Sequence, residues 1–191
     1  MKEIVSDIKA QFLILGSIVA TMWGIEILNE TIFRHDLDVL GILPRQIIGL
    51  RGLIFAPFLH GSSAHLAANT IPFLVLGWLI MAQGMADFTI VSIICIFVGG
   101  LGTWLFGANA LHIGASGVIF GYLGFLLARC YFDRRLSSGA IALFVGSTYG
   151  TVLWGVFPTS PSVSWEGHLF GFLSGILAAK IVTDATHPAK L

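Results

Sequence analysis

The chain has 191 residues, of which 56% are hydrophobic and only 10% are charged, against about 25% charged in an average soluble domain. Too little charge is available to cover a soluble surface, which excludes an ordinary soluble globular protein. The high hydrophobicity also excludes an intrinsically disordered chain. Ten basic residues balance ten acidic ones, so no basic field exists to hold nucleic acid, and no nucleic-acid partner is expected.

Six apolar runs are long enough to cross a membrane or to lie buried in a small helical bundle. They predict an all-α membrane protein with six transmembrane helices in a single domain over residues 1–191. The predicted spans are about 12–28, 63–82, 88–106, 113–128, 140–157 and 165–182. The first run is interpreted as a span and not as a signal peptide, because Glu3 and Asp7 precede it and no small-residue cleavage site follows.

The longest connection, residues 29–61, is partly apolar, and we expect it to lie at the membrane interface. Six spans bring both termini to one side of the membrane. The tails and loops on that side carry more Lys and Arg residues, over a shorter total length, than the loops on the other side. The positive-inside rule therefore places the termini in the cytoplasm and the long first loop outside. We expect a multi-pass protein of a bacterial-type inner (plasma) membrane, with membrane lipids as partners. The sequence makes no prediction of oligomeric state.

Polar side chains inside spans are costly and indicate function. Here they are His65 and Asn69 in the second span, Ser116 in the fourth and His168 in the sixth. Even-numbered spans run in the same direction, and each of these residues lies in the first turns of its helix. We therefore expect all four side chains to converge near the outer face of the membrane, with His65 and Asn69 on one helix face because they are four residues apart.

Glycines recur at intervals of three and four residues along the fourth and sixth spans, and such rows let helix backbones approach closely. We expect these two helices to pack together through them, bringing Ser116 within reach of His168. The glycines assigned to this packing are Gly114, Gly117, Gly121, Gly171 and Gly175.

The four polar residues suit acyl transfer. A serine hydroxyl becomes a good nucleophile when a base accepts its proton, and a neutral histidine serves as that base near pH 7. Ser116 opens a helix, where backbone N–H groups are unpaired and the dipole favours negative charge. Together with side-chain donors from His65 and Asn69, these groups would stabilise a tetrahedral oxyanion.

These motifs resemble the rhomboid family of intramembrane serine proteases. The resemblance rests on Gly-Ala-Ser-Gly at residues 114–117, on His60, His65 and Asn69 in the pattern H-x4-H-x3-N, and on His168 followed by Gly171 and Gly175. It implies a Ser–His dyad of Ser116 and His168, with His65, Asn69 and the Ser116 amide as the oxyanion hole. It also implies a cap at residues 157–164, no cofactor and no metal, and transmembrane segments of other membrane proteins as substrates.

Two positions depart from the family pattern. Many members carry a Trp-Arg pair in the first loop, where this chain has Arg51 and Gly52. The position four residues after the serine is often Tyr, stacked on the catalytic histidine, and here it is Phe120, which keeps the ring and loses the hydroxyl. Neither departure removes a catalytic group.

Other polar residues are interpreted as structural. We expect His60 to stabilise the first loop, His112 to be a loop residue, and Glu26 to reach the lipid headgroups. Glu166 is two residues before His168, on another helix face, and is expected to be exposed to solvent.

Two alternatives to a protease are weighed. A catalytically inactive rhomboid-like protein would bind transmembrane helices without cutting them, but both Ser116 and His168 are retained. A transporter or metal-binding protein would use His60, His65 and His168, but the sequence has neither carboxylates at mid-membrane nor an inverted repeat.

Overall fold

The structure is a computed structural model that describes residues 2–158 and 163–186. Helices dominate it, and the described residues contain no β-strand beyond an isolated bridge between Ile42 and His112. The predicted all-α membrane fold is therefore confirmed. The α-helices are α1 (Lys2–Leu28), α2 (Gly52–Phe55), α3 (Ser63–Met81), α4 (Met85–Ile94), α5 (Gly100–Phe106), α6 (Ser116–Asp133), α7 (Leu136–Tyr149) and α8 (Trp165–Thr186).

Five helical segments among the described residues are long and apolar enough to cross a membrane. They are Ser6–Phe33, Ser63–Met81, Met85–Phe106, Leu136–Val156 and Trp165–Thr186. The remaining long helix, α6, is 18 residues long and is the most enclosed of the set, with most of its side chains buried from Val118 onward. It contacts α3, α4, α7 and α8, and is therefore the central helix of the bundle.

The segment 85–106 is not one regular helix. A π-helical turn over Cys95–Gly99 separates α4 from α5. The first loop has structure of its own, since it contains short helices at Asp36–Leu40, Ile47–Arg51, Gly52–Phe55 and Ala56–Phe58.

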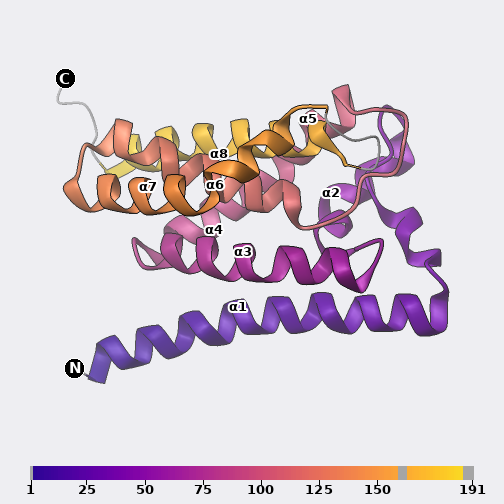
Figure 1. The fold of residues 1–191 in the computed structure, drawn as a ribbon, viewed down its shortest axis with the longest axis horizontal. Coiled ribbons are helices and arrows are strands. Elements are labelled where there is room, and N and C mark those ends of the chain that lie inside the picture. Colours follow the sequence, from indigo (N-terminus) through magenta and orange to yellow (C-terminus); the bar gives the residue numbers. More distant parts are fainter. Residues whose placement is uncertain (1, 159–162, 187–191) are drawn as a thin grey trace.

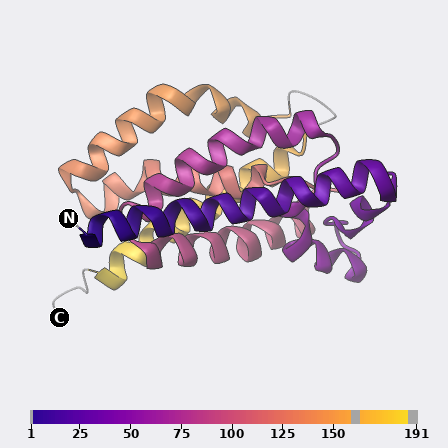
Figure 2. The same cartoon turned by 90° about the horizontal axis from the view of Figure 1, so that it is seen from below.

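The helices lie roughly along one axis, with α1 beside α3 on one side and α6, α7 and α8 on the other (Figure 1). The start of α1 and the end of α8 lie at the same end of this axis in Figures 1 and 2, and the first loop gathers at the opposite end. The starts of α3, α6 and α8 therefore face the end that holds the first loop.

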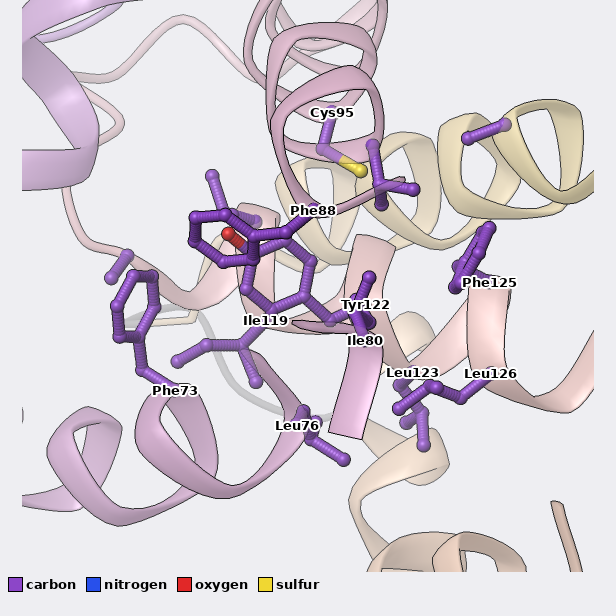
Figure 3. Packing of buried hydrophobic residues seen from close by; sticks show 14 of the residues in the cluster. Phe73, Leu76, Ile80, Phe88, Cys95, Ile119, Tyr122, Leu123, Phe125 and Leu126 are labelled. Carbon is purple, nitrogen blue, oxygen red and sulfur yellow. The ribbon is translucent and has the colours of Figure 1, made fainter. Parts of the chain in front are cut away.

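The core is built around Tyr122 of α6, which is fully buried. Phe73 from α3 and Phe88 from α4 flank its ring, each with its centroid 5.7 Å away (Figure 3). The Tyr122 hydroxyl lies 2.7 Å from the Ser92 hydroxyl, so the polar end of this residue has a hydrogen-bond partner. A buried hydroxyl without a partner would cost stability.

The end of the bundle near the termini holds a buried ion-pair cluster. Arg129 of α6 pairs with Asp87 at the start of α4 and with Asp133 one helical turn further along α6. Asp133 also accepts a hydrogen bond from Ser138 of α7 at 2.6 Å. Arg129 is almost fully buried and links α6 to α4, while Asp133 links α6 to α7.

Glycines make the tightest helix contact in the molecule. A Cβ built on Gly171 of α8 would lie 2.1 Å from the Gly117 carbonyl oxygen of α6, and one on Gly175 would lie 1.9 Å from the Gly121 carbonyl oxygen. Side chains cannot occupy such positions unless the helices move apart. Gly114 has a different role from the one expected, because it precedes α6 and takes a left-handed φ of 118°.

We predict that Gly175→Ala lowers the thermal unfolding temperature in detergent, since its new methyl group would push α8 away from α6. Gly16→Ala on α1 is the matched control, because nothing lies within 4 Å of a Cβ at that position and alanine favours helix. Equal unfolding temperatures for the two variants would contradict the close-packing account.

Candidate active site

Ser116 and His168 are hydrogen-bonded although they are 52 residues apart in the sequence. His168 Nε2 lies 2.9 Å from Ser116 Oγ, and His168 Nδ1 lies 2.9 Å from the carbonyl oxygen of Gly155. A carbonyl oxygen can only accept, so Nδ1 carries the hydrogen in the neutral ring. Nε2 therefore has a free lone pair and can accept the proton of the Ser116 hydroxyl, which is the arrangement that general-base catalysis requires.

Local backbone structure positions the serine. Gly114 has a φ that L side chains rarely adopt, and its N–H donates to the Ala56 carbonyl at 2.9 Å. This turn brings the chain to the first residue of α6, Ser116. A Cβ on Gly114 would also lie 2.9 Å from the His65 ring, so glycine is required there both for backbone conformation and for space.

His168 is positioned by the start of α8 and by an aromatic ring. Ser164 caps the helix, since its hydroxyl accepts from the Gly167 N–H at 3.3 Å. The Phe120 ring, one turn after Ser116, stacks on the His168 ring with centroids 4.1 Å apart and planes 8° apart. This stacking and the Gly155 hydrogen bond together fix the plane of the imidazole.

A cavity of about 800 Å³ opens beside the pair. His65 and Asn69 line it together with Ser116 and His168, so all four residues selected from the sequence meet at one site. Asn69 Nδ2 donates one hydrogen bond to the His65 carbonyl at 2.9 Å. An amide group has two N–H donors, so this bond leaves one available to a ligand in the cavity.

His60 has a more specific role than stabilising the first loop. It is fully buried, and its Nε2 accepts a hydrogen bond from the Ala115 N–H at 3.2 Å. It therefore contacts the backbone immediately before Ser116. Its ring also meets the His65 ring edge-on, with centroids 5.2 Å apart. Burial, with a smaller contribution from neighbouring His65, lowers the pKa of His60 to about 4, which keeps the imidazole able to accept this bond.

Glu166 differs from its expected role, whereas His112 is a loop residue, as expected. Glu166 is not solvent-exposed but 6% exposed, and its Oε1 accepts from the Ala108 N–H at 2.9 Å. His112 is also buried and lies 2.5 Å from the Ser164 hydroxyl. Both side chains are buried for the same reason, because the 107–112 segment folds against the start of α8. Helical spacing within α8 carries no signal of this contact.

Glu26 is also buried and does not reach the headgroups. The first loop packs against α1 through its turn Ala56–Phe58, and near the end of α1 Asn29 donates to Asp38 at 2.8 Å and Glu30 accepts from the Ser63 hydroxyl at 2.7 Å. The loop is fixed elsewhere by Arg51, which donates to the Val39 carbonyl at 2.8 Å. The predicted cap at 157–164 lies partly outside the described residues, which omit 159–162.

Comparison with known proteins identifies the family. A model of the Rhomboid domain matches residues 49–185, which is well over half of the chain. The chain belongs to the rhomboid family. Uncharacterized proteins of Mycobacterium tuberculosis and Mycobacterium leprae are each 41% identical to it, over 181 and 174 residues. These matches cover 90% and 86% of this chain and 75% and 68% of the relatives.

A plant relative is more distant. RHOMBOID-like protein 4 of Arabidopsis thaliana is 25% identical over 136 residues, which cover 71% of this chain and 34% of that protein. With its apolar helices, the chain is thus a rhomboid-like integral membrane protein.

We predict that His60 makes the stability of this rhomboid protein pH-dependent. Its pKa is lower in the folded protein, about 4, than the ordinary 6.5, so the unfolded chain binds more protons between these values. The neutral His60 imidazole makes its full contribution to the free energy of unfolding above pH 6.5, and this contribution declines as the pH falls toward 4. Unfolding temperatures of the wild type and His60→Gln should differ by a pH-dependent amount in this window. A constant difference would contradict the assignment.

Proposed function

We propose that this chain is an intramembrane serine endopeptidase that cleaves transmembrane segments of other membrane proteins. The single observation that carries the proposal is the hydrogen bond between Ser116 Oγ and His168 Nε2, in a ring whose Nδ1 faces a carbonyl oxygen. A bond to serine alone would also occur in an inactive protein. The tautomer, the cavity and the helix start at the nucleophile together favour catalysis.

In the proposed reaction, His168 Nε2 accepts the Ser116 proton while Oγ attacks the scissile carbonyl carbon. The tetrahedral oxyanion accepts hydrogen bonds from the Ser116 N–H, the second Asn69 N–H and the His65 ring. The imidazolium then protonates the leaving amine, and an acyl-enzyme remains on Ser116. Water from the cavity, deprotonated by His168, hydrolyses this ester and restores both residues.

The direction of the helices supports an orientation. The site lies at the ends of α3, α6 and α8 that are remote from both termini (Figures 1 and 2). With cytoplasmic termini in an inner (plasma) membrane, the cavity opens toward the outer side. Substrates would present the outer part of a transmembrane segment to it, surrounded by lipid.

The alternative is a catalytically inactive rhomboid-like protein that binds transmembrane helices. It would keep the cavity and the packing, but it would not require a base with a free lone pair directed at a serine hydroxyl. The two functions are separated by whether the reconstituted protein cuts a peptide bond.

We predict that the protein, purified in detergent and reconstituted in liposomes, cleaves members of a panel of transmembrane segments, and that Ser116→Ala and His168→Ala abolish cleavage. Ser147→Ala is the matched control, because Ser147 lies on exposed α7 and its hydroxyl bonds only its own helix at Phe144. Cleavage by Ser116→Ala equal to the wild type would exclude the mechanism. A wild type that cuts no segment would favour the inactive alternative.

Asn69→Ala should lower kcat by about 10²-fold, the usual effect of losing one oxyanion donor, with a smaller change in KM. Asn109→Ala serves as the control, because Asn109 is an exposed loop residue between Ala108 and Ala110, which line the cavity. An unchanged kcat in Asn69→Ala would remove Asn69 from the oxyanion hole.

A further inference from the structure

Glu166 lies in the same cavity as the proposed dyad, although the mechanism does not use it. It is in the first turn of α8, two residues before His168, and it lines the cavity with Ser116 and His168. A substrate segment that reaches Ser116 through this cavity therefore enters a space that Glu166 also lines.

The carboxylate is held in place. The Ala108 N–H binds its Oε1, and Ser164, which caps the same helical turn, lies against His112. The N-terminal turn of a helix also favours a negative charge. Glu166 is thus a fixed and pre-oriented negative group and not a mobile surface side chain, and pre-oriented groups contribute most to recognition.

This charge has no cationic partner in the cavity. The described lining contains no Lys or Arg, and Glu166 is its only carboxylate. No ion pair involves Glu166 among the described residues, where the ion pairs involve His35, Arg129 and Lys180. A nearly buried carboxylate without a counter-ion carries a desolvation cost, which a cation that enters its site offsets.

We propose that Glu166 determines substrate specificity by selecting transmembrane segments that carry a Lys or Arg close to the scissile bond. The basic side chain would enter the cavity and lie against the Glu166 carboxylate while the adjacent peptide bond reaches Ser116. An acidic residue at the same substrate position would be disfavoured by like-charge repulsion. This inference rests on the proposed function and names the substrate class for that same site.

The test is a substrate scan with the full-length protein in liposomes. One cleaved transmembrane segment is varied at each position flanking its scissile bond in turn, with Lys, Gln or Glu placed there. At one position, the wild type should cleave the Lys substrate with a kcat/KM about tenfold above that of the Glu substrate. The ratio should change little as salt rises, because salt screens a nearly buried charge much less than an exposed one.

Variants of Glu166 test whether this residue causes the preference for Lys over Glu in the substrate. Glu166→Gln keeps an acceptor for the Ala108 N–H but removes the charge, and should bring the Lys-to-Glu ratio close to one. Glu166→Lys should invert it. Asp184→Asn is the matched control, because Asp184 is an exposed acid at the far end of α8, paired with Lys180, and it should leave the ratio at the wild-type value.

A wild type that shows no charge preference at any position would overturn the proposal, and so would a preference that persists in Glu166→Gln. If either variant fails to fold, the wild-type scan still decides, because the proposal requires a Lys-over-Glu preference at one position. Failure of the proposed function looks different: the wild type would cleave none of the substrates, or Ser116→Ala would cleave them as well.

Discussion

The contact between the glycine rows of α6 and α8 is the constraint on which the rest of the molecule depends. Gly171 faces the Gly117 carbonyl and Gly175 faces the Gly121 carbonyl, at distances that leave no room for a Cβ. The two backbones can therefore approach until the first turns of both helices are adjacent. Ser116 begins one of these turns and His168 lies in the other, so the hydrogen bond between them is a consequence of the glycine contact.

The site orients its histidine without a carboxylate. Gly155 supplies a carbonyl oxygen to His168 Nδ1, and Phe120 fixes the plane of the ring. In a Ser-His-Asp triad the acid sets the tautomer and stabilises the imidazolium. A backbone carbonyl sets the same tautomer without an ionised group bonded to the imidazole.

The sequence predicts well that the starts of α3, α6 and α8 lie at the same end of the bundle, because this follows from the number and order of the apolar runs alone. Three even-numbered spans must run in the same direction, and the polar residues in their first turns, His65, Ser116 and His168, must reach the same side. The rows of glycines in the fourth and sixth spans also predict that these two helices pack together. Helix type and approximate span positions follow from hydropathy alone.

The roles of Glu26, His60 and Glu166 could not be predicted in the same way. Each depends on how an irregular segment packs on a helix: the first loop packs on α1, which carries the buried Glu26, the backbone before α6 donates to His60, and the 107–112 segment binds Glu166 through Ala108. No periodic pattern records such contacts, since they join residues up to 58 positions apart through single backbone groups. The π-helical turn at Cys95–Gly99 is likewise invisible to hydropathy.

The most direct test of the account is the rate at which a fluorophosphonate labels Ser116, mapped by peptide mass in the wild type and in Gly171→Ala. Both proteins are compared below their unfolding temperatures. We predict an adduct on Ser116 in the wild type and labelling at least about tenfold slower in the variant, because its methyl group separates His168 from the serine. An adduct on another serine, or equal rates in the two proteins, would contradict the claim that the glycine contact assembles the site.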